Sequence, residues 1–228
     1  QNFQEAVAWY GLAARGGDRE AQYALGMMYL RGRGVAVDRK KSADLIEQAA
    51  AQGKITAMHQ LALLYLEGSV RPRDPERAIT LLETAAEAGE VNAQYALAQI
   101  YAAGEGVPQD DGTAARWLAS AARLGLVEAQ IEYAIRLFNG AGVEKNESEA
   151  AKWFRRAAEV GNPVAQNRLA RILAAGRGVP ADPVEAGKWH FLARAAGRND
   201  VFLEQFVAGL SEQQRAAAMS AAQRWPAR

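Results

Sequence analysis

A set of small residues returns every 36 residues along this chain, and this spacing constrains the fold more than any other feature. An alanine column is made of Ala21, Ala57, Ala93, Ala129 and Ala165. Two glycine columns keep the same interval, one from Gly32 to Gly176 and one from Gly17 to Gly197. A fixed period of this length is typical of a stack of one supersecondary unit, because no unit buries its apolar face alone. The sequence therefore predicts an all-α solenoid of repeated helix pairs.

Each unit carries two apolar stripes at helical spacing, which predict two helices, here called helix A and helix B. The stripe of helix A is typified by Ala57, Leu61, Ala62 and Tyr65, and that of helix B by Ala150, Trp153 and Ala157. One column of helix B holds large residues that we expect to lie in the core: Trp9, Leu45, Leu81, Trp117, Trp153 and Trp189.

Capping residues mark where these helices begin and end. Helix A should end before the glycine column that contains Gly32, because glycine accepts the left-handed conformation after a helix. Helix B should begin after an Asp or Asn whose side chain accepts from the first turn, namely Asn2, Asp38, Asp74, Asp110, Asn146 and Asp182. A glutamate three residues later predicts capping boxes at Glu5, Glu149 and Glu185.

Composition excludes several classes of protein. An apolar fraction of 50% supports a continuous core. The balance of 27 Lys+Arg against 26 Asp+Glu leaves a net charge of +1, which argues against nucleic-acid binding. The absence of cysteine excludes disulfides and thiolate zinc sites. No apolar run is long enough for membrane insertion, and no signal peptide opens the sequence.

The loops between helix A and helix B carry a family resemblance. They read GRGVAVD, GEGVPQD, GAGVEKN and GRGVPAD, and helix B ends in an A-A-x-x-G pattern. This combination resembles the Sel-one-like repeat family, a relative of the tetratricopeptide repeats. The resemblance implies a right-handed α-solenoid of antiparallel helix pairs, with helix A lining the concave face. It also implies an adaptor or scaffold role, often in bacterial envelope or secreted proteins, and so favours a periplasmic or secreted location.

The second repeat departs from this pattern, because Val70 stands where the other loops have their second glycine, followed by Arg71-Pro72-Arg73. We therefore expect that loop to take another path.

The period also divides the chain. We expect a partial N-terminal repeat over residues 1–20, five repeats over 21–200, and a C-terminal helical cap over 201–228. In the cap, one helix over 201–210 presents Phe202 and Phe206, and Ser211 with Gln214 opens a last helix. Because Gln1 falls within an inter-helix loop, we expect the sequence to be a piece of a longer protein, with a targeting segment lost along with the part before it.

The side of helix A opposite its buried stripe, which we expect to lie on the concave face, is the predicted partner-binding face. Many of its residues are apolar, although the stack does not require this, and such a stripe is a candidate binding groove. The alternative is that part of the stripe packs against the next helix A. The predicted binding residues are Tyr23, Met27, His59, Leu63, Leu66, Tyr95, Gln99, Ile131, Ile135, Phe138, Asn167 and Arg171.

The sequence predicts no catalytic residue, metal site or cofactor. Its two histidines, His59 and His190, are about three and a half repeats apart, so they are expected to be structural. No Ser-x-x-Lys, Gly-x-Ser-x-Gly, His-Glu-x-x-His or phosphate-binding loop is present. Some cysteine-rich relatives are associated with β-lactam binding or hydrolysis, but the nucleophile and lysine for that chemistry are missing here.

The sequence thus predicts a non-enzymatic scaffold that binds a protein segment, or a glycan strand, along the helix-A face. One alternative is a carbohydrate- or peptidoglycan-associated hydrolase, including β-lactamase-like activity. A hydrolase would need a cleft with two carboxylates about 5–10 Å apart. A further alternative is a scaffold that works by self-association.

Overall fold

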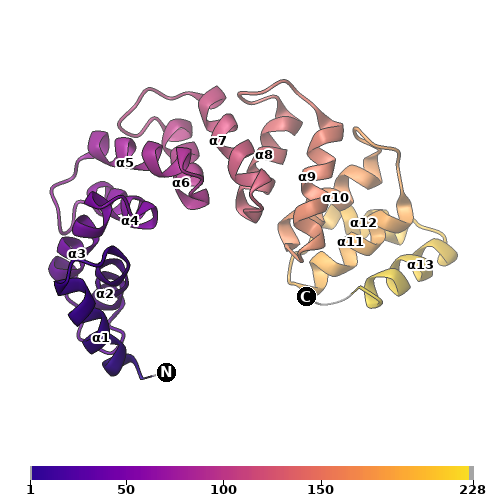
Figure 1. The fold of residues 1–228 in the computed structure, drawn as a ribbon. Helices are drawn as coiled ribbons and strands as arrows, with labels where there is room; N and C mark the ends of the chain where they lie inside the picture. The colour runs from indigo at the N-terminus through magenta and orange to yellow at the C-terminus, as the bar shows by residue number, and fades with distance from the viewer. Residues whose placement is uncertain (1, 226–228) are drawn as a thin grey trace. The chain divides into compact units, whose positions relative to one another are not determined.

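The computed structural model describes residues 2–225, which form thirteen α-helices and no strand (Figure 1). The helices are α1 (Phe3–Arg15), α2 (Arg19–Arg31), α3 (Arg39–Ala51), α4 (Ile55–Glu67), α5 (Pro75–Glu87), α6 (Val91–Ala103), α7 (Asp111–Arg123), α8 (Val127–Asn139), α9 (Glu147–Glu159), α10 (Pro163–Ala175), α11 (Pro183–Ala195), α12 (Val201–Ala208) and α13 (Glu212–Gln223). Gln1 and the last three residues of the predicted cap, 226–228, lie outside the described residues.

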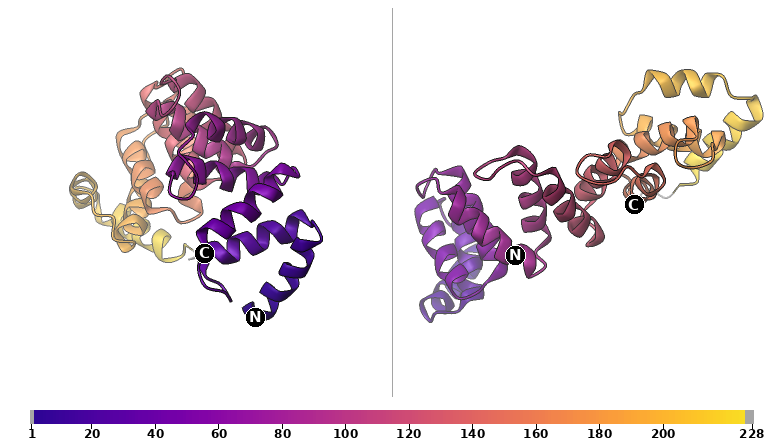
Figure 2. Two further views of the ribbon diagram at one scale, coloured as in Figure 1. Left: turned by 90° about the vertical axis from the view of Figure 1, so that its left-hand side faces the viewer. Right: turned by 90° about the horizontal axis from the view of Figure 1, so that it is seen from above.

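The chain divides into two units, Gln1–Gln109 and Asp110–Arg228. In unit 1, consecutive helices pack in pairs, from α1 with α2 to α5 with α6. In unit 2, α7 to α11 pack in the same way, and α13 packs against α11. The helices of each unit lie side by side in chain order, as both views of Figure 2 show. The predicted all-α solenoid of helix pairs is therefore confirmed, with even-numbered α2 to α10 as helix A and odd-numbered α1 to α11 as helix B.

The predicted caps of helix B are formed by all six Asp and Asn residues. Asp38, for example, accepts from the backbone N–H of Lys41 at 2.9 Å, and the other five accept in the same way. Helix A ends in a left-handed glycine in each of its five copies: Gly32, Gly68, Gly104, Gly140 and Gly176.

The capping boxes predicted at Glu5, Glu149 and Glu185 are wrong. Glu149 accepts instead from Lys152, and Glu185 accepts from Trp189 and Lys188. These partners lie three or four residues further along the same helix, and no capping box forms at the three positions. A capping box forms at the start of α13, between Ser211 and Gln214.

The buried stripe of helix A agrees with the sequence prediction, since Ala57, Leu61, Ala62 and Tyr65 are all buried. The large-residue column of helix B agrees only in part. Trp153 and Trp189 are buried, but Trp9 is 72% exposed, so its prediction is wrong. The reason is its position: α1 packs against α2, whereas α3 and α9 each pack against a helix on both sides.

The innermost large residues of helix B lie one position after that column. They are Ile46, Leu82, Leu118, Phe154 and His190, all nearly or fully buried. His190 thus occupies a core position of the repeat, which supports a structural role for it.

A buried glutamine column, which the sequence reading missed, connects each helix A to the helix B before it. Each side-chain amide donates to a carbonyl near the end of that helix B, a group that has no partner within its own helix. The pairs are Gln22 with Ala14, Gln94 with Ala86, Gln130 with Ala122, and Gln166 with Ala158. Met58 replaces the glutamine in the remaining repeat.

Except in the second repeat, the second glycine of each loop lies in close contact with the first residue of the preceding helix B. Gly178 has a φ of 69°, and a Cβ atom added to it would lie 2.5 Å from the carbonyl carbon of Glu147, the first residue of α9. Gly142 meets Asp111, the first residue of α7, in the same way. A side chain at this place is excluded both by the left-handed backbone and by the neighbouring helix.

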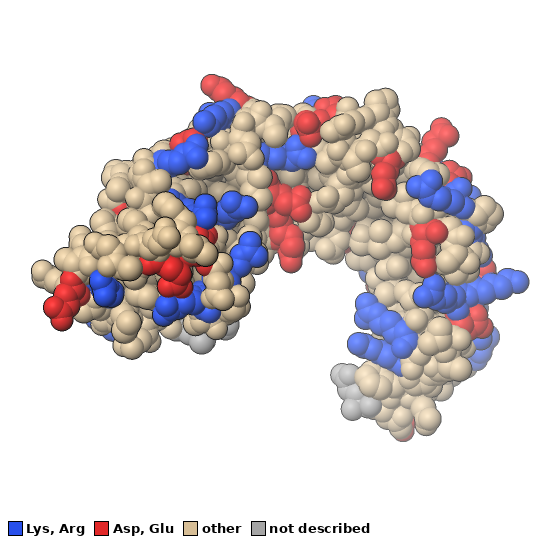
Figure 3. Space-filling model, turned by 180° about the vertical axis from the view of Figure 1, so that it is seen from behind, with Lys and Arg blue, Asp and Glu red and all other residues tan. Residues whose placement is uncertain are grey.

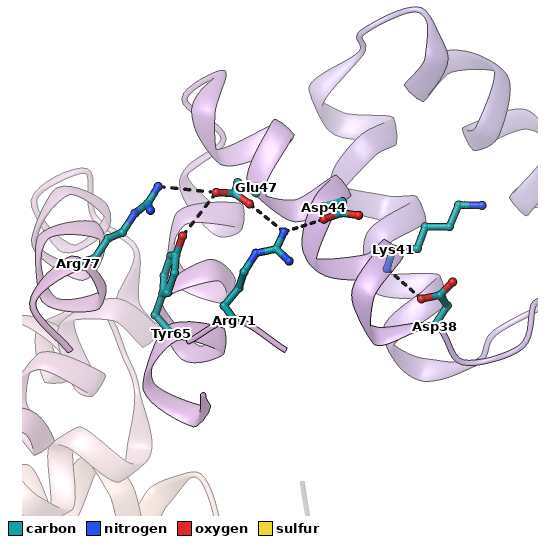
Figure 4. A network of polar contacts seen from close by, with 7 residues as sticks. All are labelled: Asp38, Lys41, Asp44, Glu47, Tyr65, Arg71 and Arg77. Atoms are coloured by element: carbon teal, nitrogen blue, oxygen red, sulfur yellow. Dashed lines mark hydrogen bonds and ion pairs between the residues drawn. The ribbon is translucent and has the colours of Figure 1, made fainter. Parts of the chain in front are cut away.

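The loop of the second repeat takes another path, as the sequence predicted. No non-glycine residue in the described chain has a positive φ, so Val70 does not reproduce the conformation of Gly142 or Gly178. Arg71 makes the contact to α3 instead, donating to Asp44 at 2.7 Å and to Glu47 at 2.9 Å (Figure 4). Tyr65 also donates to Glu47, so a polar network replaces the glycine contact.

We predict that Gly178→Ala lowers the free energy of unfolding by about 2–4 kcal/mol, because it adds overlap with α9 to backbone strain. Gly161→Ala is the matched control, since Gly161 has a φ of 90° but no atom within 4 Å of an added Cβ. It should cost only the strain, about 1–2 kcal/mol. Urea unfolding followed by circular dichroism measures both values. Equal losses would contradict the proposed packing contact.

Candidate partner-binding site

The predicted binding residues of unit 1 lie on α2, α4 and α6. Leu63 and Gln99 are exposed. The rest are half-buried, namely Tyr23, Met27, His59, Leu66 and Tyr95. Burial lowers the pKa of His59, although Glu90 opposes this shift. Some residues of the predicted binding stripe therefore pack partly against neighbouring residues, and others are open to solvent.

In unit 2, the predicted residues lie on α8 and α10. Ile131, Ile135 and Phe138 are half-buried, and Arg171 is exposed. Asn167 is only 6% exposed, so it does not present its side chain to a partner. We leave Asn167 out of the site proposed below.

Asp200, the N-cap of α12, is held by α10. Arg171 donates to both of its carboxylate oxygens, at 2.6 and 2.9 Å, and the Asn167 amide donates at 2.9 Å. The backbone N–H of Leu203 adds a longer bond of 3.3 Å. Chiefly through the Arg171 guanidinium, these donors hold the pKa of Asp200 well below its usual value, although burial opposes the shift. Asn167 and Arg171 thus anchor α12 on α10.

A pocket of about 300 Å³ lies in unit 2, and we call it the Arg168 pocket. It brings together three residues predicted from the sequence: Ile135, Phe138 and Arg171. Its other lining residues were not predicted, and they are Asn139, Phe154, Arg168, Ile172, Ala175, Arg177 and Phe202.

Phe202 comes from α12, the first helix of the predicted C-terminal cap. Phe202 is 44% exposed, whereas Leu203 and Val207 of α12 are buried. The Arg171 guanidinium lies 5.1 Å from the Phe202 ring centre, so the anchored α12 places this ring beside the pocket. The last helix is fixed by Trp225, whose ring lies 4.9 Å from that of Trp189.

The three arginines of the pocket have different partners. Arg171 is paired with Asp200, and Arg177 is paired with Glu147 while its guanidinium lies 4.2 Å from the Phe138 ring centre. Arg168 is exposed and makes no ion pair or hydrogen bond with any described residue. One signal in the sequence could have singled it out: the same position holds Ala24, Gln60, Ala96 and Glu132 in the other repeats.

Unit 1 contains a hollow of about 420 Å³ at the equivalent place in the repeat. Met27 and Arg33 there stand four periods before Arg171 and Arg177, and Tyr10 stands four periods before Phe154. Phe3 and Arg31 also line it. Aromatic walls with arginines at the rim thus occur at one repeat position in both units.

The rest of the described chain offers little for chemistry. No group of three or more His, Cys, Asp or Glu side chains among residues 2–225 is placed to hold a metal ion. Burial lowers the pKa of His190, with Glu204 opposing, and its Nε2 lies 3.1 Å from a Glu204 oxygen without the alignment of a hydrogen bond.

None of the described helices has the length and apolar character to cross a membrane. Charges of both signs are interspersed on each unit (Figure 3).

The Sel1 repeat family model matches the chain in six segments, which are residues 1–18, 19–54, 55–90, 91–126, 127–162 and 163–197. The chain therefore belongs to the Sel1 repeat family, as its loop glycines and alanine columns indicated. Proteins of this family are generally protein-interaction scaffolds and are typically non-enzymatic. No curated protein matches the sequence.

Solved structures of bacterial Sel1 repeat proteins are similar to this chain. A Sel1 repeat protein from Oxalobacter formigenes is 26% identical, with a TM-score of 0.77, over 98% of this chain and 91% of that one. The c5321 protective antigen of uropathogenic Escherichia coli is 29% identical, with a TM-score of 0.60, over 98% of this chain and 56% of its own. A putative Sel1 repeat protein from Klebsiella pneumoniae is 24% identical, with a TM-score of 0.52, over 88% and 97%, and shows the fold alone.

We predict that Asp200→Asn makes the melting temperature of the protein depend less strongly on pH in the acid range. The Asp200 carboxyl has a lower pKa in the folded state than in the unfolded chain, so the unfolded state takes up the proton first as pH falls. Its stabilisation is therefore fully present at neutral pH and declines progressively as the pH falls below about 4, towards the lower pKa of the folded state. Asparagine still caps α12 but cannot contribute this charge.

Melting temperatures measured from neutral pH down to about pH 3 provide the test. The variant should melt lower than the wild type at neutral pH, and the two curves should converge in acid. Asp18→Asn is the control, because Asp18 caps α2 without an arginine partner. Parallel curves for the wild type and Asp200→Asn would count against the Arg171–Asp200 contact.

Proposed function

We propose that this chain is a non-enzymatic interaction module that binds a polypeptide partner along its helix-A face, on the side opposite the buried stripe that the family resemblance places on the concave face. One observation carries the proposal: Ile135, Phe138 and Arg171, predicted from sequence to face a partner, line one pocket in unit 2. The stack does not dictate this chemistry, because the column of Arg171 holds Met27, Leu63, Gln99 and Ile135 in the other repeats.

The composition of the pocket supports a protein partner. Aromatic residues and arginine are enriched where protein interfaces bind most strongly, because they offer large apolar area together with directional donors. Phe138 and Phe202 supply the accessible aromatic area, and Arg168 supplies donors that no described residue uses.

The residues that line the Arg168 pocket and the unit 1 hollow favour binding over hydrolysis. A glycoside hydrolase needs two carboxylates across its cleft. No Asp or Glu is among the lining residues of the Arg168 pocket or of the unit 1 hollow. Neither lining contains a serine, lysine or histidine that could form a nucleophile–base pair for β-lactam hydrolysis.

Photo-crosslinking tests the proposed face. We predict that a benzophenone amino acid at Leu63 or Ile135 crosslinks to polypeptides in an extract of the source organism. The matched controls are Leu124 and Val160, which are apolar and 57% and 54% exposed but follow helix B. Crosslinks of equal strength at all four positions would contradict the proposal. So would turnover of peptidoglycan or of a chromogenic β-lactam by the purified chain.

A further inference from the structure

We propose that the Arg168 pocket binds an acidic peptide segment, with an apolar or aromatic side chain in the pocket and a neighbouring Asp or Glu on Arg168. This inference rests on the proposed function and specifies the chemistry of the partner. It is drawn from the charges, the aromatic walls and the volume of the pocket in unit 2.

The charges around the pocket leave one guanidinium unsatisfied. Arg171 and Arg177 each have a carboxylate partner within the chain, Asp200 and Glu147. Lys145 also pairs with Glu147, at 3.0 Å, so the positive charge of this rim exceeds the negative charge. Arg168 has no partner among the described residues. A carboxylate from a binding partner complements this excess and forms charge-assisted hydrogen bonds with the planar guanidinium.

Arg168 is not required by the architecture. It lies on α10, one turn before Arg171 and Ile172, and therefore on the same side of the helix. The equivalent residues of the other repeats are alanine, glutamine and glutamate, so the stack forms without an arginine here. We infer that the position serves binding rather than packing.

The walls of the pocket accept an apolar anchor. Phe138 and Phe202 are each covered on one side by a paired arginine, at 4.2 and 5.1 Å from the ring centres. These cation–π contacts fix the rings and place guanidinium groups at the rim. A volume of about 300 Å³ is at the small end for ligand pockets, and it suits one or two side chains of a peptide rather than a large cofactor.

A nucleic acid fits this site less well. Phosphate binding of useful strength requires several uncompensated cations, and the pocket has one unpaired arginine.

The unit 1 hollow repeats the combination of aromatic and arginine residues, with Arg31, Arg33, Phe3 and Tyr10 in its lining. Ala24 and Met27 stand there at the positions of Arg168 and Arg171, so the unpaired arginine of the pocket is particular to unit 2.

Peptide selection on the full chain tests the inference. A library of random twelve-residue peptides is selected on the purified protein, and one enriched peptide is made with a fluorescent label and an amidated C-terminus. Side chains then supply its only carboxylates. We expect enriched peptides to combine Asp or Glu with an aromatic or large aliphatic residue.

Fluorescence anisotropy then measures Kd for matched variants. Arg168→Glu should weaken binding about tenfold or more, and Arg168→Lys by about threefold or less. Phe202→Ala, which removes an exposed wall, should weaken it about fivefold. Arg123→Glu is the control for charge reversal, because Arg123 is exposed in unit 2 and is not among the residues that line the pocket. Melting curves confirm that each variant is folded.

A peptide analogue with Asn and Gln in place of its acidic residues completes a double-mutant cycle. It should bind the wild type about tenfold more weakly yet lose little more on Arg168→Glu. If the change in the peptide and the change at Arg168 weaken binding additively, the peptide carboxylate does not pair with Arg168 and the proposal is overturned. Enriched peptides without acidic residues, or competition by a single-stranded oligonucleotide at about 0.15 M salt, would also overturn the proposal.

Two outcomes separate this inference from the proposed function. If peptides bind and lose affinity on Leu63→Ala but not on Arg168→Glu or Phe202→Ala, the helix-A face binds polypeptides and the Arg168 pocket is not the site. If no peptide is enriched, both proposals fail.

Discussion

The second glycine of the inter-helix loop lies against the first residue of the helix B that precedes it, and the spacing of the repeats depends on this contact. It recurs between Gly34 and Phe3, Gly106 and Pro75, Gly142 and Asp111, and Gly178 and Glu147. There is no room for a Cβ atom on these glycines, so the loop backbone packs directly against the start of the preceding helix B. This contact fixes the distance between the loop and that helix. The buried alanines of both helices then permit close packing, and the glutamine column adds a second donor to carbonyls at the end of helix B that also accept from the backbone of the following glycine. Where Val70 removes the glycine, Arg71 and two carboxylates of α3 take its place.

Function follows from the positions that the stack leaves free to vary. The buried columns repeat nearly unchanged, whereas the outer positions of helix A change in charge and size from one repeat to the next. Arg168 and Arg171 stand at two such positions, and α12 adds Phe202 beside them. The anchor of α12, Asp200, links the end of the array to this site, since the same Arg171 holds Asp200 and lines the pocket.

Local features were the most predictable from the sequence. Helix ends are set by neighbours in the chain, so the six Asp and Asn caps of helix B and the five left-handed glycines that end helix A were identified, whereas the caps Asp18, Asn162 and Asp200 were not. The exposure of Trp9 and the glutamine bonds depend on where other helices lie, and the sequence pattern did not reveal them. Glu149 and Glu185 bond instead to side chains one turn further along their own helices, and the capping-box pattern does not decide between such local partners. The site shows the same division: the stripe with Ile135, Phe138 and Arg171 was predicted, whereas Phe154, Arg177 and Phe202 come from other elements and required the structure.

Isoleucine methyl NMR with a selected acidic peptide tests the central claim most directly. The chain has seven isoleucines, of which Ile135 and Ile172 line the Arg168 pocket. Ile46 and Ile79 are buried in unit 1 and serve as internal references. Our account predicts that the peptide shifts the Ile135 and Ile172 methyl signals and leaves those of Ile46 and Ile79 unchanged. Shifts that spare Ile135 and Ile172 would contradict it.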